Sequence, residues 1–123
     1  MKYVGNYKEL VPLDADSFKL ELLGVPPREI AYCDILEFEP GKIIYTHTDQ
    51  FLCNAINPVK YIMFLTDWDI GHIFTYNDEM LSDYKIGDLY QYSDDNTVIY
   101  SWANIGYTTS KVLEITLSDG EIL

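Results

Sequence analysis

The strongest constraint on the fold is a period of two in the apolar residues from Ile30 onward. Successive side chains of a strand point to opposite faces, so alternating or β-branched runs bounded by Gly, Pro, Asn or Asp indicate short strands joined by turns. Seven runs fit this description: residues 30–38, 42–48, 60–66, 71–76, 89–93, 97–102 and 111–117. The pattern predicts an all-β chain of seven or eight strands, arranged as a sandwich or barrel of the jelly-roll kind.

The N-terminal part differs in pattern. Residues 14–23 predict a short helix, because an Asp can cap it and Phe18, Leu22 and Leu23 form one apolar stripe. Gly24 and the Pro26-Pro27 pair end it. We therefore expect residues 1–29 to be a segment whose helix packs on the barrel, and residues 30–123 to be the β domain.

Charge and cysteine content exclude several classes of protein. The net charge of −12 argues against nucleic acid and against an anionic membrane surface, both of which need clustered Lys and Arg. The N-terminal residues show no secretory pattern, and the two cysteines, Cys33 and Cys53, are expected to be free thiols of a cytoplasmic protein. The expected partners are a small molecule or peptide and a second copy of the chain, as a homodimer.

A candidate metal motif lies in the second run. The Pro40-Gly41 turn opens a β-branched stretch that ends in His47-x-Asp49. Residues two apart on a strand share a face, and one imidazole with one carboxylate makes two ligands of a 2-His-1-carboxylate iron site. The alternative is a metal-free hydrogen bond of His47 at a strand end.

A longer set of motifs accompanies this pair. They are Gly41 with His47-x-Asp49, the stretch KYIMFLTDWDIGHIF, the turn YKIGD, the strand end YSWAN and the strand SKVLEIT. In order and spacing they resemble iron(II)/2-oxoglutarate oxygenases, particularly the compact phage and marine-bacterial type, over residues 36–117. The resemblance implies a double-stranded β-helix (jelly roll, cupin-like) fold. It also implies iron held by the HxD pair and a second histidine, and 2-oxoglutarate bound by an arginine on the last strand.

Two positions depart from that resemblance. The second histidine should stand four residues before Asn104, where this chain has Tyr100. The arginine should stand six residues after Asn104, where this chain has Ser110. The predicted metal ligands are therefore His47, Asp49 and Tyr100, with Fe(II) as the expected metal. His72 is expected to be a hydrogen-bonded histidine on an edge strand.

The same two replaced residues also determine what we expect of the cofactor site. Alternation places Ser110 and Glu114 on one face of the last strand and Lys111 on the other, so the pocket face would present a carboxylate and no cation. Lys60 is the one candidate cofactor-binding residue, and 2-oxoglutarate is expected to bind poorly or not at all. The predicted pocket lining is Tyr45, Trp102, Asn104 and Glu114.

Three functions remain open from the sequence. The first is a non-canonical or inactive relative of the iron(II)/2-oxoglutarate oxygenases, which would be a non-haem iron dioxygenase if active. The second is a non-catalytic small-ligand-binding or assembly module of cupin-like fold, favoured by the two replaced residues. The third is a cupin-type isomerase or small-molecule binder, which a histidine at the position of Asp49 would favour. No catalytic residue beyond the metal ligands is assigned.

Overall fold

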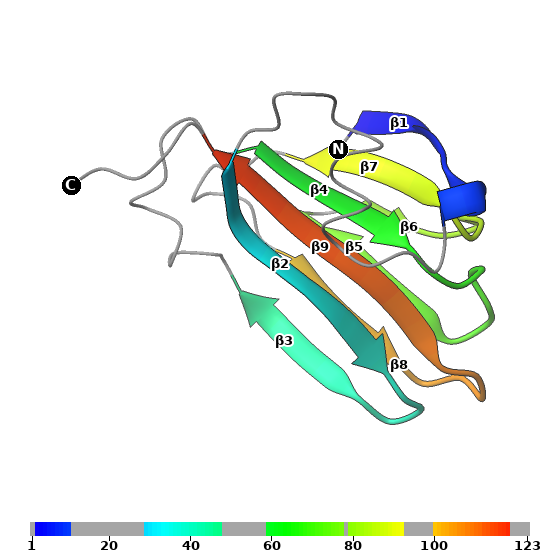
Figure 1. The fold of residues 1–123 in the computed structure, drawn as a ribbon. Coiled ribbons are helices and arrows are strands. Elements are labelled where there is room, and N and C mark those ends of the chain that lie inside the picture. Colours follow the sequence, from blue (N-terminus) through cyan, green and yellow to red (C-terminus); the bar gives the residue numbers. More distant parts are fainter. Residues whose placement is uncertain (1, 11–28, 48–58, 78, 93–99, 119–123) are drawn as a thin grey trace.

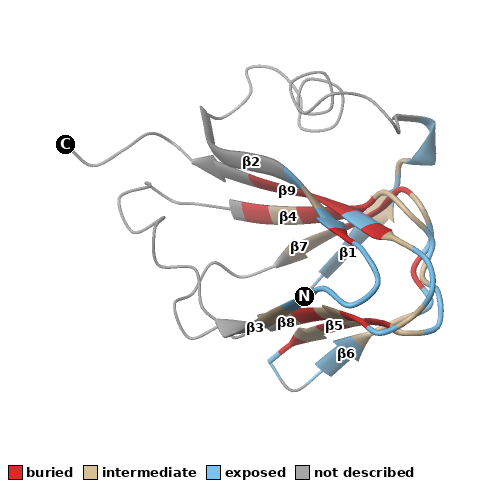
Figure 2. Ribbon diagram, turned by 90° about the horizontal axis from the view of Figure 1, so that it is seen from below, coloured by how far each residue is buried: buried red, intermediate tan, exposed pale blue. Residues whose placement is uncertain are grey.

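The computed structural model consists of two antiparallel β-sheets packed face to face (Figures 1 and 2). The structure describes residues 2–10, 29–47, 59–77, 79–92 and 100–118. Within them, no helix has the length and apolar character needed to cross a membrane. The helix expected over residues 14–23 and the loop at 51–58 lie outside the described residues.

The larger sheet has five strands in the order β1-β7-β4-β9-β2. Its strands are Lys2–Asn6 (β1), Asp88–Tyr92 (β7), Val59–Phe64 (β4), Ser110–Ser118 (β9) and Glu29–Phe38 (β2). A single 3₁₀ turn, Lys8–Leu10 (η1), follows β1. The sequence analysis did not identify β1, which pairs only with β7 at the edge of the sheet.

The smaller sheet has four strands in the order β3-β8-β5-β6. Its strands are Ile43–His47 (β3), Tyr100–Asn104 (β8), His72–Tyr76 (β5) and Glu79–Leu81 (β6). The three-residue β6 was also missed, because so short a strand shows no alternation. The predicted runs at 42–48, 71–76 and 97–102 correspond to β3, β5 and β8, although residues 97–99 lie outside the described part.

An aromatic core fills the space between the two sheets. Phe64 stacks on Tyr84 with ring centroids 3.6 Å apart, and Trp102 stacks on Phe74 at 3.9 Å and on Phe38 at 5.0 Å. Ile62, Tyr76 and Val112 complete the buried cluster. Aromatic rings bury a large area each, so this cluster is a major source of the folding free energy.

The central part of the outer face of the five-stranded sheet is buried as well, whereas Ile35 of the edge strand β2 is half exposed. Met63 stands between Leu89 and Leu113 in the sheet, and all three are buried, as is Ile115. The near-continuous apolar run of β4 reflects this burial on both faces, as predicted from its sequence. The prediction of a packed apolar face on β9 is confirmed for Leu113 and Ile115; Lys111 on the same face is exposed.

Candidate functional site

The sandwich has two ends of different character. Four described turns, at residues 39–42, 65–71, 82–87 and 105–109, connect strands of one sheet to strands of the other and lie together at one end, called here the turn end. At the opposite end, called here the far end, β3 and β5 finish and β4 and β8 begin. Most of the predicted site residues fall at the far end.

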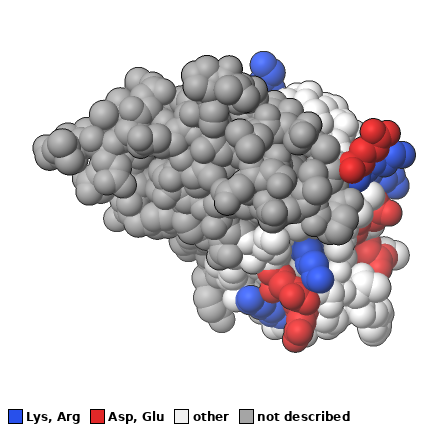
Figure 3. Space-filling model, in the orientation of Figure 1, with Lys and Arg blue, Asp and Glu red and all other residues white. Residues whose placement is uncertain are grey.

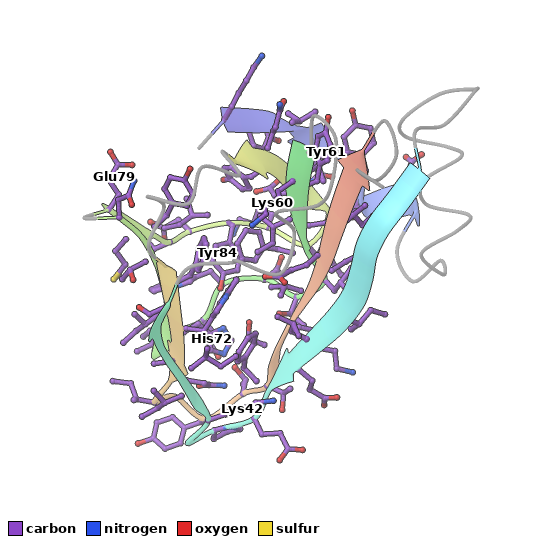
Figure 4. The ribbon with its side chains drawn as sticks, turned by 90° about the vertical axis from the view of Figure 1, so that its left-hand side faces the viewer. Lys42, Lys60, Tyr61, His72, Glu79 and Tyr84 are labelled. Carbon is purple, nitrogen blue, oxygen red and sulfur yellow. The ribbon has the colours of Figure 1, made fainter. Side chains whose placement is uncertain are left out.

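Lys60 stands on the inner face of the five-stranded sheet near the far end. It lies opposite Thr116 of β9 and Tyr92 of β7, and only 4% of its side chain is exposed. Its side chain points from β4 into the space between the sheets (Figure 4). Two residues further along β4, Ile62 belongs to the core, so the alternation of β4 brings Lys60 and the apolar core onto the same face.

Glu114 is another ionisable residue on this inner face. It is 8% exposed, and it stands opposite Ile62 on one side and Asp34 on the other. Lys60 faces Thr116 two residues further along β9, so Lys60 and Glu114 occupy diagonal positions. Diagonal neighbours in an antiparallel pair are within reach of long side chains. The sheet thus brings a basic and an acidic side chain together inside the sandwich.

The four-stranded sheet contributes a row of three residues at the same end. His47 of β3 stands opposite Tyr100 of β8, and Tyr100 stands opposite Tyr76 of β5. Asp49 lies outside the described residues. The sequence analysis did not single out Tyr76, whose place in this row is revealed by the register of β5 against β8.

A β-bulge sets the position of His47. Ile43 and Ile44 stand opposite Ala103 and Trp102, but the register shifts by one residue before His47. Two residues of β3 then oppose one of β8, and a bulge of this kind reverses the alternation that follows it. Simple alternation, which would place Tyr45 and His47 on one face, therefore does not hold through this part of β3.

Trp102 and Asn104 lie away from the far end. Trp102 is buried between Phe38 and Phe74, and within the described part of the chain its Nε1 has no hydrogen-bond partner. Asn104 is fully buried at the turn end. Its position at the end of β8, four residues from Tyr100, separates it from the His47 row by about 13 Å.

His72 belongs to a hydrogen-bonded turn. The Asp69 N–H donates to His72 Nδ1 (3.3 Å), which leaves the proton of the neutral ring on Nε2, 2.9 Å from the Thr108 carbonyl oxygen. The prediction of a hydrogen-bonded histidine is confirmed. The prediction that its strand lies at the edge of the sheet is wrong, because β6 adds to β5 on the side away from β8.

Four described ionisable groups have pKa values moved by their surroundings, among them Tyr3, whose pKa is raised by burial and by the neighbouring Asp88. Burial raises the pKa of Tyr84 to about 12, although a hydrogen bond with Ser110 lowers it in part. Burial, with Asp88 nearby, also raises the pKa of Tyr90. A hydrogen bond from Thr108 holds the pKa of Asp69 below its usual value. Tyr84 and Tyr90 therefore remain neutral hydroxyls at physiological pH.

The described residues contain no group of three or more His, Cys, Asp or Glu side chains placed to share a metal ion. Two surface hollows of about 320 and 340 Å³ are lined by described turn residues, at 6–9 and 37–42 respectively. Neither set of lining residues includes Lys60 or Glu114.

No protein-family model and no curated protein sequence matches this chain. Solved structures do match its fold. A predicted oxalate decarboxylase from Thermotoga maritima is 17% identical with a TM-score of 0.51, covering 72% of this chain and 67% of its own. A cupin protein from Bacteroides fragilis is 13% identical with a TM-score of 0.52, covering 74% and 68%. The Cnp3 cupin domain of Schizosaccharomyces pombe is 12% identical with a TM-score of 0.50, covering 76% and 64%.

At these identities the likeness concerns the fold and not the chemistry. The two facing antiparallel sheets agree with it, and they confirm the predicted all-β class. The specific likeness to 2-oxoglutarate oxygenases has no counterpart among these structures. The chain has the cupin, or double-stranded β-helix, fold.

Proposed function

We propose that the chain is a small-ligand-binding protein of cupin fold, whose ligand lies between the sheets at the far end, beside Lys60 and Glu114. The observation that carries this proposal is the burial of both side chains on one inner face. Lys and Glu are almost never fully buried unless they are paired. A buried ion pair is often no more stabilising than apolar residues of the same volume. A core built for stability alone would therefore gain little from two buried ionisable side chains, even if they were paired.

The surroundings favour a polar ligand of small size. Tyr76 and Tyr90 belong to or border the core close to these two side chains, because they share the inner faces of β5 and β7. Binding sites for small molecules combine mostly apolar and aromatic walls with a few placed polar groups. Lys60 would orient an acidic or carbonyl group, and Glu114 would accept hydrogen bonds from a donor.

A thermal-shift screen of the full chain against small organic acids, amino acids and sugars tests this proposal. We expect at least one compound to raise the melting temperature, because a ligand that binds only the folded state stabilises it. Titration calorimetry of that compound should show binding lost in Lys60→Met and retained in Lys111→Met, a matched change at an exposed lysine of β9. The proposal fails if no compound shifts the melting temperature, or if both variants bind as the parent does.

The register of β3 against β8 favours a second candidate, a non-haem iron oxygenase. His47 and Tyr100 are two of the three predicted metal ligands, and they occupy directly opposite positions. Opposite positions of an antiparallel pair have Cα atoms about 4.5–5.5 Å apart, close enough for their side chains to share one ion. Asp49 would supply the carboxylate. Iron bound there would supply oxygen activation, while these three side chains would hold it in place.

Melting curves recorded without oxygen, with Fe(II) or Mn(II) added, test the second candidate. The parent should melt higher with metal, whereas His47→Ala and Asp49→Ala should show no shift and Glu39→Gln, at an exposed turn residue, should shift as the parent does. A parent that shows no shift at about 1 mM metal contradicts this candidate.

We also propose that 2-oxoglutarate is not the ligand. A buried carboxylate is best recognised by a bidentate guanidinium, and Ser110, at the position the resemblance gives to arginine, is buried against Tyr84. Glu114 on the same face would repel a dicarboxylate. Titration calorimetry with metal present and oxygen excluded should show no tight binding. A low-micromolar dissociation constant would contradict this proposal and would favour a working oxygenase.

A further inference from the structure

The outer face of the four-stranded sheet is apolar in a chain of high negative charge. Phe74, Trp102 and Ile44 of this sheet face the core, so the residues next to them in sequence face outward. Across the sheet, Ile43, Ala103 and Ile73 stand in one row, and Thr75 and Met80 are opposite each other in the next. The backbone pairing continues past β8, because Ile105 N donates to Gly71 O at 2.9 Å.

Three apolar side chains of this face are exposed, and Ile73 and Ala103 between them are half-buried. Ile43 is 51% exposed, Met80 57% and Ile105 69%. The two remaining outward residues of these rows, Thr75 and Ser101, are hydrogen-bonded to each other through their hydroxyl groups. The outward positions described on this face carry no charged side chain. Exposed apolar areas of this kind on a soluble chain commonly mark an interaction surface.

The other sheet differs in this respect. Its outward residues on the central strands, Met63, Leu89, Leu113 and Ile115, are buried, and only toward its edge strand β2 is an outward apolar residue of the described part, Ile35, half exposed. In Figure 2 the four-stranded sheet forms the lower layer, and no described element covers its outer side. The charged side chains visible in Figure 3 lie on the side of the five-stranded sheet and along the turns.

We propose that this face, formed by Ile43, Ile73, Met80, Ala103 and Ile105, is the interface of a homodimer. The net charge of the chain favours a second copy over a basic partner as the occupant of this face. Each copy carries −12, so two copies that meet through charged surfaces repel each other. Through this face they bring together only uncharged side chains, and a two-fold axis places the same apolar patch on both sides. A basic partner would instead bind to the acidic parts of the chain's surface.

The size of the face indicates a reversible dimer. Strands about 4.8 Å apart and about five residues long at about 3.4 Å each give four strands a projected area of about 300 Å². Interfaces that bury less than about 1,200 Å² in total belong to weak or transient complexes. We therefore expect a dissociation constant of about 10–100 µM, rather than a permanent dimer.

Sedimentation velocity of the full chain from about 5 to about 500 µM, a range that brackets the expected constant, tests the proposal. The average mass should rise with concentration from the 14.2 kDa of one chain toward twice that value. Higher salt should favour the dimer, because salt screens the repulsion between like-charged copies. A parent that stays monomeric over the whole range, or a dimer that salt dissociates, overturns the proposal.

Two isoleucines provide a matched pair of variants. Ile43 on β3 and Ile35 on β2 both lie on edge strands and are 51% and 50% exposed, but Ile35 belongs to the five-stranded sheet. Ile43→Lys should keep the chain monomeric at about 500 µM, whereas Ile35→Lys should dimerise as the parent does. Circular dichroism and melting temperature should confirm that both variants fold. Equal effects of the two changes, or no effect of Ile43→Lys in a folded protein, would refute the proposed surface.

Discussion

A single buried amide, that of Asn104, holds together two segments at the turn end. Its Nδ2 donates to the carbonyl oxygens of Phe38 (2.7 Å) and Thr108 (2.8 Å), and its Oδ1 accepts from the Gly106 N–H (3.0 Å). The side chain is fully buried, so no water replaces these bonds when they are lost. The residue that the sequence assigned to a pocket lining thus links β2 to the turn after β8.

Asn104→Ala should lower the free energy of unfolding by about 3 kcal/mol, because it removes three hydrogen bonds, one of them to the buried carbonyl oxygen of Phe38. Urea denaturation followed by fluorescence measures this change. Tyr107→Ala, at an almost fully exposed residue of the same turn, should change the value by less than about 0.5 kcal/mol. Equal values for the two variants would show that the amide bonds contribute little.

The free energy of unfolding should depend on alkaline pH through the phenol group of Tyr84. Burial raises the pKa of this group to about 12 in the folded chain, above the value near 10 of an unfolded one. Its contribution is therefore fully present below about pH 10 and is lost as the pH rises through about 12. We expect a loss on the order of 2 kcal/mol from this group over that window.

Urea denaturation at several pH values between about 9 and 12 measures this loss, and Tyr84→Phe should show a shallower fall in stability than the parent. Tyr107→Phe is the matched change at an exposed tyrosine and should keep the slope of the parent. Identical slopes for all three proteins would mean that Tyr84 does not carry the alkaline loss.

At the turn end, the backbone of the turn at residues 65–71 packs against the backbone of the turn at residues 105–109. Gly71 and Gly41 share a φ of +93°, which L-residues with a side chain rarely adopt. A Cβ at Gly71 would overlap the backbone nitrogen of Gly106, whereas a Cβ at Gly41 would have no atom within 4 Å. The connection between β4 and β5 thus needs glycine for space as well as for conformation.

Comparing Gly71→Ala with Gly41→Ala separates these two requirements. Gly41→Ala should cost about 1 kcal/mol from backbone strain alone, and Gly71→Ala should cost at least about 3 kcal/mol because the turn must move. Denaturation midpoints of the two variants provide the measurement. A smaller cost at Gly71 than at Gly41 would contradict the close approach of the turns.

The charge of the whole chain opposes its compact state. With 20 acidic and 8 basic residues, folding brings like charges together, and salt screens their repulsion. The melting temperature at about 5 µM, below the expected dimerisation range, should therefore rise as NaCl increases from about 10 to about 200 mM. Differential scanning fluorimetry measures it, and a melting temperature that falls with salt would indicate that attractive ion pairs dominate instead.

The fold class and most of its strands could be predicted from the sequence, because alternation and turn residues are local signals. The runs of β2, β4, β5, β7 and β9 are visible in the order of apolar residues alone. The edge strand β1 was not, since its residues are mostly exposed and therefore show no apolar alternation. The three-residue β6 is too short for any periodic signal.

Composition and alternation by themselves determined an all-β chain of the jelly-roll kind, and alternation placed Glu114 on the pocket face. The double-stranded β-helix and the candidate Lys60 were implied by the resemblance. Only the tertiary structure decided which residues meet. The pairing of β4 with β9 brings Lys60 and Glu114 to diagonal positions, and the bulge in β3 brings His47 opposite Tyr100. Register depends on partners dozens of residues away, and one residue of shift moves a side chain to the other face, so no local pattern could have fixed it.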